Sequence, residues 1–255
     1  MRTITARLPE GVKETLRCFR DLVSFTRKGR KHMFCPVCKK SSSRFLEFGE
    51  VPRANARCPH CESLERHRLL WLYLTEKTDL LDGRPKKVLH VAPERCLLKK
   101  LEERLGEGYL TADLEAPNVM VKMDITHIEY AEESFDVILC SHVLEHVPDD
   151  RKALREFHRV LKQDGWAILL VPITAKATFE DPSIVDPQER LRVFGQEDHV
   201  RRYGPDYLDR LREAGFDVEV VRIEDLTSAE RAVQMGLATG NREVYFCTKH
   251  RQPSP

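Results

Sequence analysis

The chain has 255 residues, of which 41% are hydrophobic and 33% charged, and its formal net charge is +1. This composition predicts a soluble globular protein with a full core. No segment approaches the roughly 18 consecutive apolar residues of a membrane span, and the first residues lack the apolar run of a signal peptide. We therefore expect a cytoplasmic protein with no membrane partner.

The charge is unevenly distributed along the chain. Residues 1–80 carry 17 Lys/Arg against 9 Asp/Glu, and residues 81–255 carry 25 against 32, so their net charges are +8 and −7. The basic front part can attract either an anionic partner or its own acidic neighbour. We expect residues 1–31 to form a basic N-terminal helix or extension.

Two Cys-x-x-Cys pairs follow, with the spacing C-x2-C-x19-C-x2-C. Each pair can form a tight knuckle, and four thiolates favour a closed, tetrahedral, structural zinc site. The expected zinc ligands are Cys35, Cys38, Cys58 and Cys61. The apolar residues between the pairs, in "RFLEFG", predict a hairpin, so the module is similar to a zinc ribbon.

The segment "SLERHRLLWLYLTEKTDLL", residues 63–81, has apolar residues at near-helical spacing and predicts a connecting helix. Ser63 is the expected N-cap. Two interpretations of its basic residues stay open: they reach a ligand in the second domain, or they form an exposed basic face. These residues are Arg66, His67 and Arg68.

From residue 86 onward, short apolar runs alternate with helical patterns, which predicts an α/β domain around a largely parallel sheet. Ligands of such sheets bind at the carboxyl ends of the central strands. Asp113 closes the second predicted strand, where a carboxylate can accept hydrogen bonds from ribose hydroxyls. The expected parts of the chain are 1–31, the zinc ribbon and connecting helix over 32–82, and a domain over 83–255 with an insertion at 174–204.

The segments "KMDI", "SFDVILCSHVLEHVPD" and "LKQDGWAILLVP" resemble the class I S-adenosylmethionine-dependent methyltransferases, of the type 11-like kind. The resemblance covers residues 86–173 well and extends to residue 249 in pattern. It implies a Rossmann-like, seven-stranded, mostly parallel sheet with one antiparallel strand, "EVYFCTK". It also implies S-adenosylmethionine as cofactor.

The resemblance assigns cofactor contacts to five positions. Asp113 would hold the ribose, and Asp124 would contact the adenine amino group. Ile125 would pack on the adenine ring. Ser141 and His142 would lie near the methionine part of the cofactor.

The first motif of that family normally holds an aspartate and three glycines, and all four are changed in this chain. The matching positions are His90, Ala92, Glu94 and Cys96. Ala92 is the smallest substitute for a glycine that lets the backbone approach the ligand. We predict that Glu94 pairs with the cofactor ammonium group while Arg95 or Lys99 neutralises its carboxylate. A site that has lost its cofactor is the alternative.

The insertion 174–204 is far longer than an ordinary connection, and long loops at this edge are usually functional. Within its "GQEDHVRRY" stretch, we predict His199 as the general base and Asp198 as the carboxylate that orients it. The same stretch supplies two cations for an anionic substrate, Arg201 and Arg202.

The loop after the fourth predicted strand carries the alternative base. His142 follows this strand directly and is nearer than His199 to the expected methyl group. Glu145 and His146 follow in the same loop, where such residues more often face helix packing or solvent.

The favoured function is S-adenosylmethionine-dependent methyl transfer to a small molecule or a sugar hydroxyl, with a small-molecule or glycan acceptor as partner and structural zinc in the ribbon. One alternative is an RNA methyltransferase that docks RNA through the basic ribbon, although the ribbon lacks a run of aromatics for base stacking. The other is a non-catalytic adaptor with a methyltransferase-like fold.

Overall fold

The computed structural model describes residues 32–49, 51–240 and 242–250, so the helix predicted within 1–31 lies outside the described residues. Its centre is a seven-stranded sheet in which β13 alone runs antiparallel to its neighbours. In sheet order the strands are β12 (Phe216–Arg222), β13 (Glu243–Lys249), β9 (Leu161–Leu170), β8 (Phe135–Ser141), β5 (Val88–Val91), β6 (Tyr109–Asp113) and β7 (Val121–Lys122). The predicted class I methyltransferase fold, with "EVYFCTK" as the antiparallel strand, is confirmed.

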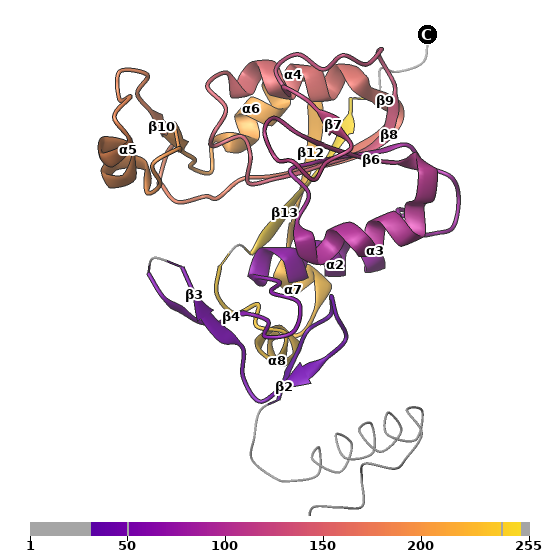
Figure 1. Ribbon diagram of the computed structural model, residues 1–255, viewed down its shortest axis with the longest axis vertical. Helices are drawn as coiled ribbons and strands as arrows, with labels where there is room; N and C mark the ends of the chain where they lie inside the picture. The colour runs from indigo at the N-terminus through magenta and orange to yellow at the C-terminus, as the bar shows by residue number, and fades with distance from the viewer. Residues whose placement is uncertain (1–31, 50, 241, 251–255) are drawn as a thin grey trace, which may run out of the picture.

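Helices cover both faces of the sheet (Figure 1). On one face lie α4 (Asp150–Val160) and α6 (Tyr207–Glu213), and on the other lie α2 (Glu65–Glu76), α3 (Arg95–Leu105) and α7 (Ile223–Leu226). Helix α4 begins where the Asp149 side chain accepts a hydrogen bond from the Lys152 amide. Its apolar residues recur at helical spacing and are buried against the sheet. No helix among the described residues is long and apolar enough to cross a membrane.

The front module consists of two antiparallel hairpins followed by α2. The hairpins pair β1 (Met33–Phe34) with β2 (Ser41–Ser42) and β3 (Leu46–Phe48) with β4 (Arg53–Arg57). The predicted hairpin and connecting helix are present, but the predicted N-cap is wrong. Leu64 precedes the helix, while the Ser63 hydroxyl lies 3.2 Å from the Cys35 sulfur.

The C-terminal part of the chain returns to this module. After α7, helix α8 (Ala229–Gln234) packs beside β1, and the guanidinium of Arg68 bonds to the carbonyls of Met235 and Gly236 at 2.7 and 2.8 Å. Arg68 also donates to the Ser63 carbonyl and lies over the Phe45 ring. Arg68 is fully buried, so it joins the ribbon, α2 and the C-terminal segment and does not contact a ligand.

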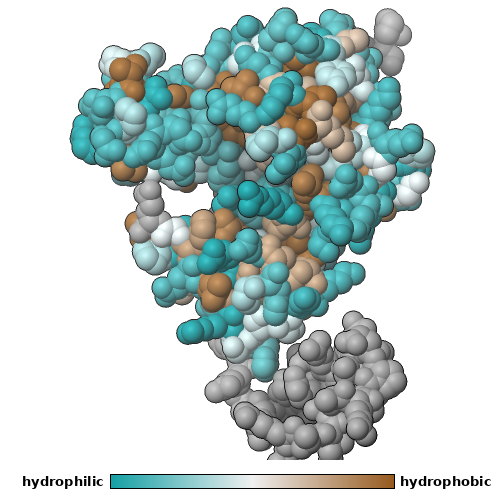
Figure 2. All heavy atoms as spheres, in the orientation of Figure 1, coloured by the Kyte–Doolittle hydropathy of each residue, from teal (hydrophilic) through white to brown (hydrophobic). Residues whose placement is uncertain are grey.

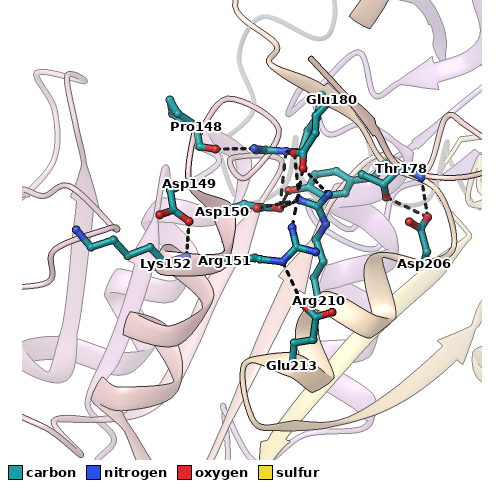
Figure 3. Close-up of polar contacts among 12 residues, drawn as sticks. Pro148, Asp149, Asp150, Arg151, Lys152, Thr178, Glu180, Asp206, Arg210 and Glu213 are labelled. Carbon is teal, nitrogen blue, oxygen red and sulfur yellow. Dashed lines mark hydrogen bonds and ion pairs between the residues drawn. The ribbon is translucent and has the colours of Figure 1, made fainter. Parts of the chain in front are cut away.

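The insertion forms a projecting arm that contains β10 (Phe179–Glu180), α5 (Pro187–Phe194) and β11 (Arg201–Arg202) (Figure 1). The visible surface of the arm is mostly hydrophilic (Figure 2). Its base is tied to α4 and α6, where Asp150, Glu180 and Arg210 point toward one another (Figure 3). Arg210 of α6 bonds to Asp150 of α4 at 2.7 Å and to Glu180 of the arm, whose side chain is 35% exposed, at 3.0 Å, so ion pairs hold the base of the arm to both helices.

Replacing Arg68 with alanine should lower the free energy of unfolding by about 3 kcal/mol or more, because three carbonyls lose a charged donor in a buried site. The matched control is Arg84→Ala, since Arg84 is 72% exposed and its ion pairs should contribute under about 1 kcal/mol. Urea unfolding of both variants is the measurement. An equal loss in the two variants would contradict this role of Arg68.

Candidate functional site

The strand order reverses between β5 and β8, and this is where parallel sheets bind ligands. The residue directly after each of these strands has left-handed backbone geometry: φ is +47° at Ala92 and +56° at His142. This conformation disfavours residues other than glycine, and such strain concentrates at functional sites. The two strained residues therefore mark the carboxyl edge of β5 and β8 as the candidate site.

Ala92 explains how the turn after β5 forms without glycine. Its amide donates to the Ala112 carbonyl of the neighbouring strand at 2.8 Å, and the chain then enters α3 through Glu94 as N-cap. Among residues other than glycine, alanine has the smallest side chain, so it clashes least with the backbone in the left-handed conformation. The turn thus keeps a shape that suits glycine although its sequence has changed.

Replacing Ala92 with glycine should raise the free energy of unfolding by about 0.5 to 1 kcal/mol. Glycine removes the steric cost of the left-handed backbone, and this stabilisation exceeds the entropic cost of a more flexible unfolded chain. The control is Ala112→Gly in β6, where we expect a loss of about 1 kcal/mol. Urea unfolding compares the two variants. A loss at both positions would show that Ala92 is not strained.

Glu94 presents a buried, ionised carboxylate at this turn. The fully buried His90 ring bridges the Tyr109 hydroxyl at 2.6 Å and Glu94 Oε2 at 2.8 Å. Burial alone would raise the pKa of Glu94, but the hydrogen bond and the charge of His90 outweigh it and hold this pKa at about 2. The second oxygen, Oε1, is buried and has no hydrogen-bond partner in the described structure. This oxygen can accept hydrogen bonds from a cationic ligand group.

Helix α2 brings a cation to the same place. Burial lowers the pKa of Arg66, and the negative charges of Glu94 and Glu145 act in the opposite direction. Burial, together with the positive charge of Arg66, lowers the pKa of His67 to about 4. Arg66 is half-buried and His67 is buried, so these two residues form no exposed basic surface. Their contact with a ligand stays a prediction.

The cations predicted beside Glu94 on α3 lie elsewhere. Arg95 is exposed, and Lys99 is 84% exposed with its amine 3.8 Å from Glu103 on the same helix. Both follow the N-terminus of α3 on its outer surface. The charge of Glu94 acts on Arg66 of α2, so Arg66 is a further candidate to neutralise the cofactor carboxylate. The role predicted for Arg95 or Lys99 stays a prediction.

The remaining predicted cofactor residues lie along the same edge. Asp113 ends β6, and its Oδ1 accepts from two backbone amides at 2.8 Å, those of Glu115 and Ala116. Asp124 is exposed and accepts from the Thr126 amide, whereas Ile125 is buried. Their assigned roles in binding the cofactor stay predictions.

Ser141 ends β8, and its hydroxyl is buried without a hydrogen-bond partner in the described structure. His142 follows with its Nδ1 3.3 Å from Glu145, and its Nε2 is likewise unpartnered. Polar atoms buried in this way are costly unless a ligand satisfies them. These two residues are suited to contact a ligand at the end of β8.

The loop after β8 meets the insertion in a cluster of histidines. The His146 and His199 rings pack edge to face with centroids 4.6 Å apart, and the Val200 amide donates to the Glu145 carbonyl. The structure differs from the prediction at Asp198, whose carboxylate lies 3.0 Å from His146 Nδ1. Asp198 thus pairs with His146, because residues 195–198 form a turn after α5 that brings Asp198 to the loop after β8. Glu145 and His146, expected to face packing or solvent, belong to the site.

The two arginines of the insertion that were predicted to bind an anionic substrate form hydrogen bonds within the protein. Arg201 is 3% exposed and donates to the backbone carbonyls of Leu144, Val147 and Pro148. Arg202 bonds to Thr174. Arg201 therefore holds the loop after β8 in place and is not free to bind an anionic substrate.

The four cysteines of the ribbon come together as predicted. Their sulfurs lie within 4.8 Å of one another, with Cys35 3.6 Å from Cys61 and Cys38 3.8 Å from Cys58. A tetrahedral zinc ion with Zn–S bonds of about 2.3 Å requires sulfurs about 3.8 Å apart. Both knuckles also turn alike, since the residue after each second cysteine, Lys39 or Glu62, is left-handed. The donor set fits zinc.

Comparison with known proteins agrees with the fold. Residues 78–169 match the model of the family described as a methyltransferase domain. This segment is therefore similar to a methyltransferase domain, and the strand order of the sheet agrees with the class I methyltransferase fold.

Individual relatives match parts of the chain. It is 40% identical to the uncharacterized methyltransferase YcgJ of Bacillus subtilis over 74 residues, which are 29% of this chain and 28% of YcgJ. It is 27% identical to a ubiquinone biosynthesis O-methyltransferase of Glaesserella parasuis over 165 residues, covering 49% and 69% of the two chains. An S-adenosylmethionine dependent methyltransferase structure from Mesorhizobium loti superposes with a TM-score of 0.48 at 16% identity. The superposition covers 69% of this chain and 96% of that chain. The chain spans under a third of YcgJ and 21% of the protein YafS of Escherichia coli.

Proposed function

We propose that the protein is an S-adenosylmethionine-dependent methyltransferase that acts on a hydroxyl group of a small molecule or sugar. The observation that carries this proposal is the Glu94 carboxylate oxygen at the turn after β5, which is buried and has no hydrogen-bond partner in the described structure. The negative charge of Glu94 also acts on the guanidinium of Arg66 in α2. The amino-acid end of the cofactor carries the complementary pair, an ammonium and a carboxylate.

The other residues of the edge fit the rest of the cofactor. Asp113, fixed by two amides at the end of β6, would hold the ribose hydroxyls. Asp124 would contact the adenine, and Ile125 would pack on it. Ser141 and His142 would contact the methionine part.

When bound, the cofactor supplies an activated methyl group on a sulfonium. The acceptor oxygen would attack the methyl carbon in line, and the sulfur would leave with the electron pair of the carbon–sulfur bond. The chain has to position that oxygen and accept its proton. His142 and His199 are the candidate proton acceptors at the edge, since the Nε2 atom of each is buried without a partner. Support for a hydroxyl acceptor comes from relatives that are named as O-methyltransferases of ubiquinone biosynthesis and as a 27-O-demethylrifamycin SV methyltransferase.

Calorimetry with S-adenosylmethionine and S-adenosylhomocysteine tests cofactor binding. We expect dissociation constants of roughly 1–100 μM, about −8 to −5.5 kcal/mol. Arg66→Ala should weaken binding about 10-fold or more, because the cofactor carboxylate loses its cation, and Asp113→Ala should weaken it similarly. The matched control is Arg95→Ala, which removes an exposed arginine near the same turn and should leave binding unchanged. Absence of heat with either ligand would contradict the proposal.

We also propose that the four cysteines hold one structural zinc ion. Burial raises the pKa of the Cys38 thiol to about 11, so a cation is needed to keep it ionised at neutral pH. The ion would tie both hairpins to the start of α2, which carries Arg66.

Removing zinc with a strong chelator should lower the melting temperature and abolish cofactor binding, because α2 loses its attachment to the hairpins. Metal analysis of the untreated protein should give one zinc per chain. Cys58→Ser should lose this zinc, whereas Cys96→Ser, a half-buried cysteine outside the knuckles, should keep it. Zinc retained in Cys58→Ser would contradict the assignment.

A further inference from the structure

Three side chains from two distant segments converge beside the candidate site. Glu145 and His146 come from the loop after β8, and His199 comes from the insertion. One donor atom from each lies within 4.8 Å of the other two. Glu145 and His199 are 2% and 7% exposed, so most of this cluster is removed from solvent. The arrangement has the size of a metal site.

Two donor atoms of this cluster have no partner. Glu145 Oε2 and His199 Nε2 are buried without a hydrogen-bond partner in the described part of the chain. A buried polar atom left unpaired costs about 1–3 kcal/mol, so two of them in one place call for a common ligand. A carboxylate oxygen and an imidazole nitrogen can both bind a divalent metal ion.

The third ligand is oriented by a carboxylate. Asp198 lies 3.0 Å from His146 Nδ1, which leaves Nε2 as the nitrogen available to a metal. In histidines that bind metals, the N–H of the other ring nitrogen usually donates a hydrogen bond to a carboxylate in this way. This hydrogen bond fixes the orientation of the ring and raises the basicity of the nitrogen that binds the metal. Asp198, predicted to orient a base, thus acts as a positioning residue for a ligand.

The two segments are also locked together. Arg201 donates to the carbonyls of Leu144, Val147 and Pro148, and the Val200 amide donates to Glu145. The backbone on both sides of Glu145 and His146 is therefore fixed against the segment that carries His199. A metal site requires this, because ligands on loops that move apart bind weakly.

We propose that Glu145, His146 and His199 bind one first-row divalent metal ion, whose open positions take the hydroxyl group of the acceptor. This inference rests on the proposed methyltransferase function. The bound cation lowers the pKa of the hydroxyl, and its proton passes to the unpartnered Nε2 of His142. The oxygen then forms a bond to the methyl carbon while the carbon–sulfur bond breaks and its electron pair returns to sulfur. His199 is a metal ligand in this scheme, and His142 is the base.

Electron paramagnetic resonance of Mn²⁺ tests the site on the full chain loaded with one equivalent of zinc, which the four thiolates of the ribbon bind in preference to Mn²⁺ and which leaves the second site open. We expect one bound Mn²⁺ per chain in the wild type. His146→Ala and His199→Ala should lose it. Asp198→Asn should weaken it about 10- to 100-fold, and since the Asp198 side chain is 68% exposed, this variant should fold normally. The control His250→Ala removes an exposed histidine and should bind as the wild type does.

S-adenosylhomocysteine binding, measured separately by calorimetry, distinguishes the two proposals. Protein that binds S-adenosylhomocysteine but no Mn²⁺ overturns the metal site and leaves the methyltransferase function standing. Protein that binds Mn²⁺ through these residues but no S-adenosylhomocysteine supports the metal site and overturns the function. Equal Mn²⁺ binding by the wild type, His146→Ala and Asp198→Asn would show adventitious binding elsewhere and overturn the metal site.

Discussion

The buried guanidinium of Arg68 is the interaction on which the arrangement of the site depends. It joins the carbonyls of Ser63, Met235 and Gly236, so the ribbon, α2 and the C-terminal segment form one body. Helix α2 is thereby fixed against α3 and α7, and Arg66, two residues before Arg68, lies in the electrostatic field of Glu94. The ribbon therefore holds in place the helix that carries Arg66.

Local pattern was sufficient to predict the α/β class and the cysteine knuckles, because alternating strands and helices and paired cysteines leave a periodic or fixed-spacing signal in the sequence. The seven strands and the antiparallel strand followed from the family resemblance. The turn after β5 was also within reach, because Ala92 replaces a glycine with the smallest side chain that a left-handed residue can carry. Such features depend on neighbours in the chain.

The parts of the site that escaped prediction depend on contacts between distant segments. The charge of Glu94 acts on Arg66 because α2 packs on α3, and His146 pairs with Asp198 because the insertion folds back over the loop after β8. The sequence spacing of Asp198 and His199 suggested a pair, but the turn over residues 195–198 directs the Asp198 carboxylate to His146. The sequence signal that could have indicated the proposed metal site was a Glu–His pair in the loop after the fourth strand, together with a further histidine in a long insertion.

The proposed cofactor site and the proposed metal site lie in one electrostatic environment. Arg66 lies in the fields of both Glu94 and Glu145, and each of these carboxylates keeps one buried oxygen without a partner in the described structure. The other oxygen of each carboxylate faces an imidazole, that of His90 at 2.8 Å from Glu94 and that of His142 at 3.3 Å from Glu145. A cofactor ammonium at Glu94 and a metal ion at Glu145 would contact the two remaining oxygens, and their positive charges would leave the Arg66 guanidinium freer to bind the carboxylate of the cofactor.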